Sequence, residues 1–465
     1  MEEDIRKDIK WAQINANVLH SMQRPRRVYW IMISVCIALV AAGGFAVAYQ
    51  YNYGMGAALL NRPQMWGLYI ATFVFWIGVS HAGTLLSAIL HITQSDWRKP
   101  IYRSAEAMTA FSVMTAGLFP LIHLGRIWDF YWTMPYPNER GLWPNFRSPL
   151  LWDLVAIMTY LTSSLLFLYI GMIPDLAICR DNATGWRRKL YTALALGWQG
   201  SDRQWRNFRR TYLLMACFLI PLAVSVHSIV ASDFAMSIMP GWHVTSFPPY
   251  FVSGALYSGC AGIITLFILL RYTFRYEDYL TYPILDKVCK LTFAIAMVWT
   301  YLNLIEFANV WYGHNMFDKE VLIEKATGPY APFWWTMIIF GMVLPFALLS
   351  HRIRRNMKIL MTISLLLNVG MWLERWMIVS PTLAANHMPY TWDYHWPGWV
   401  ELTILMASFA WFTLLFLVFV KIFPSVSMYE VKEMLYHRRH VSDRLEQDAD
   451  ADDHLRIPLT KGETP

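Results

Sequence analysis

The chain has 465 residues, of which 56% are hydrophobic, 16% are aromatic and only 15% are charged. Soluble domains carry about 25% charged residues, so this composition excludes an ordinary soluble domain. The net charge of +7 comes from short loops between apolar runs, and such dispersed charge does not indicate a nucleic-acid-binding surface. The composition indicates an all-α integral membrane protein.

Long apolar runs occupy most of the sequence, and each approaches the roughly 20 residues that a helix needs to cross about 30 Å of hydrocarbon. We predict ten transmembrane helices, at residues 28–50, 65–92, 104–132, 150–173, 209–232, 249–272, 287–311, 332–351, 358–381 and 399–423. Together they form a predicted membrane domain over residues 28–423. Ten helices are too many for one simple bundle, so we expect an internal subdivision.

Lysine and arginine residues are concentrated in alternate connections between the predicted helices. Cytoplasmic loops carry an excess of these residues, which places both termini on the cytoplasmic side. Residues 1–27 are predicted to form a cytoplasmic amphipathic segment, because their apolar residues follow a helical period. This face consists of Ile5, Ile9, Ala12, Ala16 and Leu19. Residues 424–465 are predicted to form a cytoplasmic C-terminal helix and an acidic tail.

The sequence contains no recognisable ligand set for a redox cofactor or a metal. Its five cysteines form no CxxC pair, so motifs for iron–sulfur clusters, c-type haem and structural zinc are absent. A b-type haem needs two histidines that face each other, but His81 and His91 lie about 80° apart on one helix. We therefore expect no haem, metal or iron–sulfur cluster in this chain.

Ionisable residues lie inside several predicted helices, where a charge near the bilayer centre costs at least roughly 2.5–3.5 kcal/mol. The topology brings most of them toward the outer side, namely His123, Arg126, Asp129, Asp153, His227, Asp233, Glu306, Glu374 and Arg375. His81 lies near the midplane, and Glu106 lies at the cytoplasmic end of the third helix. We expect the outer residues to meet in one polar pocket beneath the outer membrane surface.

A quinol is a ligand that suits such a pocket. Its two oxygens each lose a proton as electrons leave, and histidine or carboxylate side chains accept protons well near neutral pH. His123 and Asp153 are the favoured acceptors, and Arg375 is able to donate to a quinone oxygen. Because His123 and Arg126 are three residues apart, we expect them to share one helical face. With no electron carrier expected in the chain, electrons must pass to a partner.

Structural interpretations stay open for several of these residues. Glu374 and Arg375 are about 100° apart on a helix, so ion pairs with other helices, rather than with each other, are an alternative role. Asp129, Asp233 and Glu306 lie near the membrane interface, where hydration by water is an alternative to a functional role. A purely structural role, in which its ring forms a hydrogen bond to another helix, is the alternative for His81.

Two other classes of membrane protein are alternatives to a quinol-oxidising one. A secondary transporter also places charges near the midplane, usually on helices that Gly or Pro interrupts. Pro120 and Pro221 interrupt two predicted helices, but the charges lie farther outward than alternating access requires. A passive membrane anchor would leave the buried charges unexplained.

Six blocks of the sequence resemble the NrfD/PsrC family of quinol-interacting membrane subunits. They are WIGVSHAGTLLSAILHI (76–92), HLGRIWDFYW (123–132), PNFRSPLLWD (144–153), FPPYFVSGALYSG (247–259), YLNLIEFANVWYG (301–313) and NVGMWLERWMIVSPTL (368–383). The resemblance covers about residues 65–381. Ten spans with a long C-terminal extension are most similar to the larger members found in alternative complex III, of the ActC type.

This resemblance implies two four-helix bundles, here with two peripheral helices, in a bacterial cytoplasmic (inner) membrane. It implies menaquinol oxidation at a periplasm-facing pocket, with no cofactor in the chain itself and with outward release of protons. Electrons would pass to a docked iron–sulfur subunit and then to c-type haem subunits. A second NrfD-like membrane subunit, small membrane subunits and lipid are the other implied partners, and nucleic acid is not one. Whether the chain also translocates protons is an open question.

The resemblance also assigns roles to residues by their position. It makes His123 and Asp153 the quinol-contacting pair, and it makes His81, Asp233, Glu374 and Arg375 further members of the pocket or of a proton path. The topology adds Arg126, His227, Glu306 and Glu106, the last as the candidate for proton uptake from the cytoplasmic side. The sister ActF type shares the fold and is the alternative assignment.

Overall fold

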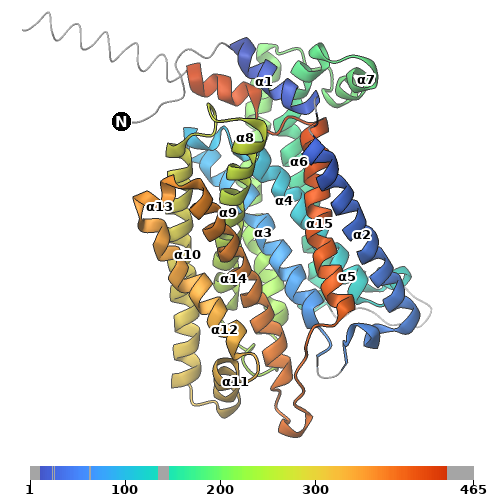
Figure 1. The fold of residues 1–465 in the computed structure, drawn as a ribbon, viewed down its shortest axis with the longest axis vertical. Coiled ribbons are helices and arrows are strands. Elements are labelled where there is room, and N and C mark those ends of the chain that lie inside the picture. The colour runs from blue at the N-terminus through green and yellow to red at the C-terminus, as the bar shows by residue number, and fades with distance from the viewer. Residues whose placement is uncertain (1–10, 24, 26, 62–63, 135–145, 437–465) are drawn as a thin grey trace, which may run out of the picture.

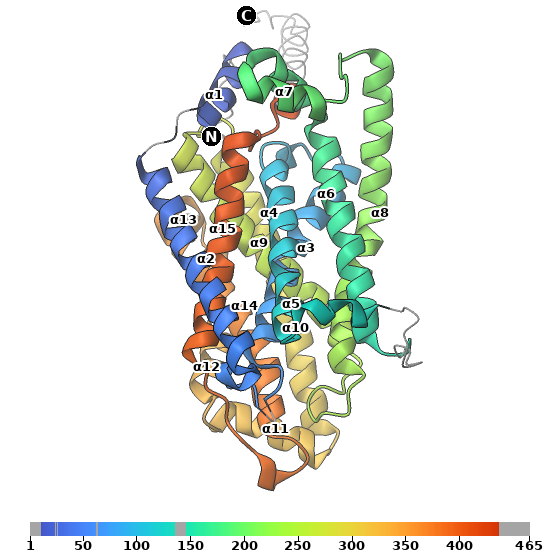
Figure 2. The ribbon, with the colours of Figure 1, turned by 90° about the vertical axis from the view of Figure 1, so that its right-hand side faces the viewer.

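The structure is a computed structural model, and it describes residues 11–436 apart from 24, 26, 62–63 and 135–145. Every regular element in these residues is a helix, and ten helical runs among them are long and apolar enough to cross a membrane. The runs lie roughly side by side along the long axis of the molecule (Figures 1 and 2). The predicted all-α class and the number of spans are confirmed.

The ten spans follow one another in chain order. They are α2 (Arg27–Tyr53), α3 (Gly67–Ile92), α4 (Tyr102–Ala116) with α5 (Leu118–His123), α6 (Pro149–Asn182), α8 (Asp202–Ala235), α9 (Phe247–Phe274), α10 (Tyr282–Tyr312), α12 (Ala331–Ile338) with η4 (Ile339–Val343) and η5 (Leu344–Leu349), α14 (Met357–Ala384) and α15 (Trp399–Ile422).

Short helices cover the two ends of the bundle. One end carries α1 (Trp11–Gln23), η2 (Asp96–Arg98), α7 (Gly185–Leu194) and α13 (His351–Arg355), and we call it the α1 end. The other carries η1 (Met55–Ala58), η3 (Ile127–Thr133), α11 (Met316–Thr327) and η6 (Pro389–Thr391), and we call it the α11 end. Figure 1 shows α1 and α7 at the top and α11 at the bottom. The α11 end corresponds to the side that the charge pattern predicts to face outward.

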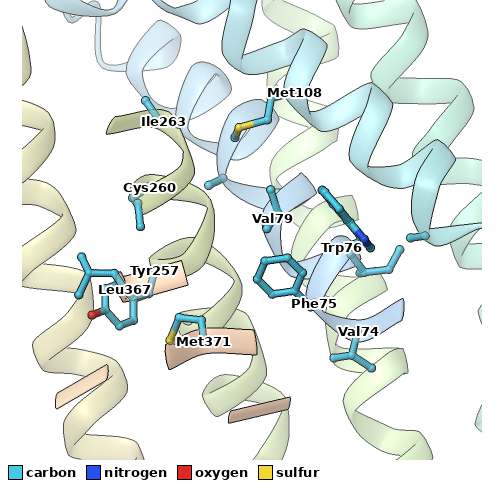
Figure 3. Close-up of a cluster of buried hydrophobic side chains, with 14 of the residues drawn as sticks. Val74, Phe75, Trp76, Val79, Met108, Tyr257, Cys260, Ile263, Leu367 and Met371 are labelled. Carbon is cyan, nitrogen blue, oxygen red and sulfur yellow. The ribbon is translucent and has the colours of Figure 1, made fainter. Parts of the chain in front are cut away.

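Helix α3 lies at the centre of the bundle, and almost all its residues from Gly67 to Ala88 are buried. It packs against α4, α8, α9 and α14. Figure 3 shows apolar side chains that these helices contribute to the core, including Phe75 of α3, Met108 of α4 and Met371 of α14. Other contacts pair α6 with α4 and α8, α10 with α9, and α2 with α15 at the outside. The grouping into two four-helix bundles stays a prediction.

Glycines allow α3 to approach its neighbours closely. A Cβ atom on Gly83 would lie 2.0 Å from the backbone oxygen of Ala105 in α4, and one on Gly259 of α9 would lie 2.1 Å from the Cβ of Ala82. Within lipid, apolar burial does not drive helices together, so such close packing has to stabilise their association.

The third span ends earlier than predicted. Helix α5 ends at His123, and Gly125 then adopts a positive φ of 68°, which glycine tolerates without steric cost. Arg126 has a non-helical backbone with φ −136°, and Asp129 lies in the separate helix η3. The prediction that His123 and Arg126 share a helical face is therefore wrong.

The eighth span is an interrupted helix. It changes from α-helix to a π-helical turn and then to a 3-10 helix that contains Pro345. Proline has no N–H, and its ring displaces the carbonyl four residues earlier. That carbonyl, of Gly341, instead accepts a hydrogen bond from the hydroxyl of Tyr257 at 3.1 Å. The freed carbonyl is thus hydrogen-bonded by a protein side chain rather than by water in an open cavity.

The N-terminal helix docks on the chain itself through a face that differs from the predicted one. Ile14, Val18 and Met22 are its buried residues, whereas Ala12 and Ala16 are exposed. The polar side chains of the helix contact the connection after α9 in two places, where Asn17 donates to the hydroxyl of Tyr279 and Ser21 pairs with that of Tyr276. Ile5, Ile9 and the acidic tail lie outside the described residues, whereas residues 428–436 are helical as predicted.

The contact between α3 and α4 can be tested by adding a single methyl group. We expect Gly83→Ala to destabilise the folded chain by about 1–3 kcal/mol, the usual cost of overpacking, because the new Cβ meets the backbone of α4. Gly44→Ala is the control, since nothing lies within 4 Å of its Cβ position. Thermal unfolding in detergent measures both variants, and equal midpoints would contradict the close contact.

Candidate functional site

A cavity of about 380 Å³ opens at the α11 end between the termini of several helices. Its described lining consists of Met65, Trp66, Ser148, Pro149, Leu150, Ser232, Asp233, Met236, Ser237, Met239, Trp242 and Leu383. The rings of Trp66 and Trp242 lie 5.3 Å apart, and Phe234 packs against both. The indole N–H of Trp242 donates to the carbonyl of Ile378 at 2.7 Å, which fixes this ring to α14.

Two carboxyl groups lie side by side next to this cavity. Asp153 on the first turns of α6 and Asp233 near the end of α8 interact directly through their side chains, and Asp233 also lines the cavity. One oxygen of each is buried and has no hydrogen-bond partner. Two carboxylates at such close range repel each other, so the pair is able to take up one proton and share it.

The other predicted residues of this region lie apart from the carboxyl pair. His123 at the end of α5 is half-buried, and its Nδ1 atom is buried without a hydrogen-bond partner. Among the described residues, neither a hydrogen bond nor an ion pair joins His123 to Asp153. Arg126 is exposed beyond the end of α5.

Two histidines meet in the middle of the bundle. His81 of α3 and His227 of α8 have ring centroids 4.6 Å apart, and Tyr160 of α6 stacks on His81 at 4.8 Å. The two ring nitrogens of His81 contact the carbonyls of Ile77 at 2.6 Å and Ala223 at 2.9 Å. Both ring nitrogens of His227 are buried and lack a hydrogen-bond partner.

Glu374 and Arg375 form a buried ion pair with each other, with 3.1 Å between Arg375 Nε and Glu374 Oε2. The expectation that each pairs with another helix is wrong. Helical rotation separates their backbones, but the long arginine side chain folds back toward the carboxylate. Its guanidinium also lies 4.4 Å from the ring of Phe251, and it donates to the carbonyl of the same residue at 3.4 Å.

Lys325 lies close to the Glu374–Arg375 pair, although the sequence places it in a loop between two predicted spans. Lys325 on the short helix α11 lies near Glu306 and Glu374, which both influence its charge. Burial lowers the pKa of Lys325 and outweighs these carboxylates, which raise it. Glu374 in turn interacts with Tyr250, whose hydroxyl accepts a hydrogen bond from Asn303 at 3.0 Å.

Glu106 lies near the opposite end, as predicted, and it is fully buried. One of its carboxylate oxygens accepts hydrogen bonds from Ser87 and Tyr212, each at 2.7 Å, and the other has no partner. Arg103, one turn earlier on α4, pairs with Asp175 of α6 at 3.2 Å. Asp175 is a functional candidate that sequence reasoning missed, because it lies just beyond the predicted span 150–173, whereas α6 extends to Asn182.

Glu401 is another buried charge that sequence reasoning missed. It lies on the first turn of α15 and accepts the backbone N–H of Leu68 at 3.1 Å, so it caps the N-terminus of α3. Its second oxygen contacts His395 Nε2 at 2.7 Å. The pair stabilises the start of the central helix.

The predicted residues therefore form several groups at different depths rather than one cavity. The groups are the carboxyl pair at the cavity, the histidine pair in the middle, the group around Glu374 and the inner group around Glu106. Arg375 is close enough to His81 and His227 to influence their charge, and it links two of these groups. Of the predicted residues, Asp233 is the one that lines the described cavity.

The fold and these groups define a class, namely a multi-pass integral membrane protein with ionisable side chains inside its helical core. The family described as polysulphide reductase, NrfD, matches residues 57–385, which extend from η1 through α14. The chain belongs to this NrfD family.

Three relatives cover similar shares of the chain. A putative dimethyl sulfoxide reductase membrane subunit of Halobacterium salinarum is 27% identical over 352 residues, which are 74% of this chain and 75% of the relative. A selenate reductase subunit of Mesobacillus selenatarsenatis is 25% identical over 78% of this chain and 83% of its own length. The Hdr-like menaquinol oxidoreductase integral membrane subunit of Archaeoglobus fulgidus is 22% identical over 68% and 70%, respectively.

The buried ion pair predicts an unequal effect of single and double substitutions. Arg375→Met leaves Glu374 as an uncompensated buried charge, so we expect a loss of about 3–5 kcal/mol in stability. The double variant Glu374→Met/Arg375→Met removes both charges, and we expect it to be more stable than Arg375→Met alone. Thermal unfolding of the purified variants measures this coupling. Additive losses would show that the two side chains do not stabilise each other.

The histidine contacts predict that the purified chain shows no Soret absorption band. No group of three or more potential metal-ligating side chains occurs within the described residues. His81 directs both ring nitrogens to carbonyls, so its ring is not free to ligate haem axially, and His91 Nδ1 accepts a hydrogen bond from Arg98 at 2.7 Å. A visible spectrum of the chain purified without partners checks this expectation. A stoichiometric haem signal would contradict it.

Proposed function

We propose that this chain is the quinol-binding and quinol-oxidising membrane subunit of a multi-subunit oxidoreductase. The observation that carries the proposal is the pair Asp153 and Asp233 beside a cavity of about 380 Å³. Ligand sites of about 300–1,000 Å³ that are mostly apolar and contain a few polar groups are typical for small molecules. The tryptophan and methionine side chains of this cavity suit an aromatic head group with an apolar tail.

The carboxyl pair supplies the proton acceptor that the reaction needs. A quinol hydroxyl donates a hydrogen bond to one carboxylate, and the proton moves to the pair as electrons leave the ring. Complete oxidation of one quinol yields a quinone, two protons and two electrons. His123, whose Nδ1 atom has no partner, is the proposed second acceptor. The protons then leave toward the α11 end.

Menaquinol is the proposed substrate, and alternative complex III is the proposed assembly. One relative is by name a menaquinol oxidoreductase subunit, and the sequence blocks resemble the ActC type. The electron acceptor is then an iron–sulfur subunit docked at the α11 end, with c-type haem subunits and a second NrfD-like membrane subunit as further partners. The proposed membrane is the bacterial cytoplasmic membrane, with the α1 end inside. The proposed membrane domain comprises residues 28–423, between a cytoplasmic N-terminal segment and a cytoplasmic C-terminal segment.

The groups at other depths are proposed to carry protons rather than to contact quinol. His81, His227, Glu306, Glu374 and Arg375 form this proposed path, and Glu106 is its proposed inner end. The ActF-type assignment would keep the path without quinol oxidation. A transporter is disfavoured, because at the interruption near Pro345 the carbonyl of Gly341 is hydrogen-bonded by Tyr257 and Trp299 packs against Gly341, rather than being left for a substrate.

Asp153→Asn tests the proposed reaction. The amide keeps the shape of the carboxyl group but cannot accept a proton, so we expect quinol oxidation by the assembled complex to fall about 100-fold or more. Reduction of the electron acceptor by a menaquinol analogue measures turnover, and the protein composition of the purified complex reports assembly.

The matched control is Asp129→Asn, because Asp129 lies in η3 at the same end but outside the spans. We expect it to keep normal turnover. Wild-type activity of an intact Asp153→Asn complex would remove the carboxyl pair from the mechanism. Co-purification of the chain with iron–sulfur and c-type haem proteins tests the wider assignment, and their absence would favour another oxidoreductase of this family.

A further inference from the structure

The C-terminal segment, residues 425–436, is bound to the α1 end by buried polar contacts. Asp175 of α6 accepts hydrogen bonds from the hydroxyl of Ser427 at 3.0 Å and from the backbone N–H of Tyr429 at 3.1 Å. The same carboxylate pairs with Arg103, and both charged side chains are fully buried. The segment thus supplies two of the hydrogen bonds that stabilise this ion pair in the protein interior.

A second buried ion pair holds the segment to the connection between α3 and α4. Glu430 contacts Arg98 at 3.0 Å, and both side chains are almost completely buried. Burial alone would lower the pKa of Arg98, but Glu430 and neighbouring tyrosines raise it above its ordinary value. Arg98 therefore stays charged, and its attraction to Glu430 fixes the position of the segment.

The apolar face of the segment packs against the α1 end of the bundle. Val426, Met428, Val431 and Met434 are fully buried. Met428 packs in the same apolar cluster as Cys179 of α6. In Figure 1 the C-terminal helix lies beside α1, across the end of the bundle. The segment therefore closes this end with both charge pairs and apolar packing.

Polar atoms without partners lie directly beneath this closure. The Nε and Nη1 atoms of Arg103 and the Oε2 atom of Glu106 are buried and lack hydrogen-bond partners. At Gly171 the absent side chain leaves a Cβ position 3.8 Å from both Arg103 Nη2 and Glu106 Oε2. Such unsatisfied groups bind water readily when water can reach them.

We propose that the C-terminal segment is a seal that keeps water at the α1 end away from Arg103 and Glu106. The residues that form it lie after residue 385, where the family match ends, so the family core alone does not contain this closure. Because Glu106 is also the proposed inner end of the proton path, the closed segment limits proton uptake there, and a permanently water-filled connection would let protons leak through the inner half of the bundle. The seal itself does not depend on the proposed function, whereas its benefit to a gradient-building complex does.

The accessibility of a reporter thiol tests the seal. Ser87→Cys places a thiol where the native hydroxyl contacts Glu106 at 2.7 Å. Inside-out membrane vesicles that contain the full assembled complex are treated with a membrane-impermeant methanethiosulfonate reagent. Mass spectrometry of the peptide then gives the labelling rate. Cys260, which is fully buried in the core, serves as the internal reference.

Three substitutions, each combined with Ser87→Cys, distinguish loss of the seal from a general disturbance of the structure. Glu430→Ala removes one partner of a buried ion pair, and we expect labelling to rise on the order of 100-fold. Ser427→Ala removes a single hydrogen bond, and we expect a rise of about tenfold. Glu433→Ala is the matched control, since it breaks only the partly exposed contact with Lys99 at 3.5 Å, and we expect no change.

Unchanged labelling in Glu430→Ala and Ser427→Ala, or an equal rise in Glu433→Ala, would overturn the proposal. If the Glu430→Ala complex does not assemble, Ser427→Ala decides the question, because its ion pairs stay intact. Proteoliposomes with an imposed pH gradient provide a second readout, since the gradient should decay faster with Ser427→Ala than with Glu433→Ala. Neither assay uses quinol, so a failed seal and a failed assignment of Asp153 are told apart.

Discussion

A polar group inside hydrocarbon has no water to bind, so the protein must supply its partner, and much of this structure follows from that constraint. The carbonyl that Pro345 displaces is satisfied by Tyr257. The exposed N–H at the start of α3 is satisfied by Glu401. Where partners are missing, at Asp153, His227 and Glu106, the unpaired atoms mark the places where a substrate, a proton or water is expected to act.

The central position of α3 connects these places physically. Its start is capped from α15, its middle presents His81 to α8, and near its end Ser87 contacts Glu106 of α4. Because α3 is buried on all sides, a displacement along it would disturb contacts at three depths. The groups along the bundle thus share one rigid support, although they do not share one cavity.

Local properties of the sequence predict much of this arrangement. Length and hydropathy identify each span, and charges within apolar runs identify His81 and Glu106, which are buried, and Asp153, which is half-buried. The contacts between side chains depend on helix rotation and side-chain reach, which sequence spacing does not determine. For this reason sequence spacing does not predict the ion pair between Glu374 and Arg375, nor that Lys325 on the short helix α11 lies near Glu306 and Glu374.

The segment after residue 385 has a consequence for biosynthesis. The chain is made from its N-terminus, so α3, α4 and α6 are complete before Glu401 and Glu430 exist. Until then Arg98 lacks its carboxylate partner Glu430, and the N–H of Leu68 at the start of α3 lacks its cap from Glu401. Final packing of the earliest helices therefore waits for the last part of the polypeptide. Interrupted translation would leave uncompensated charges that expose the incomplete product to degradation.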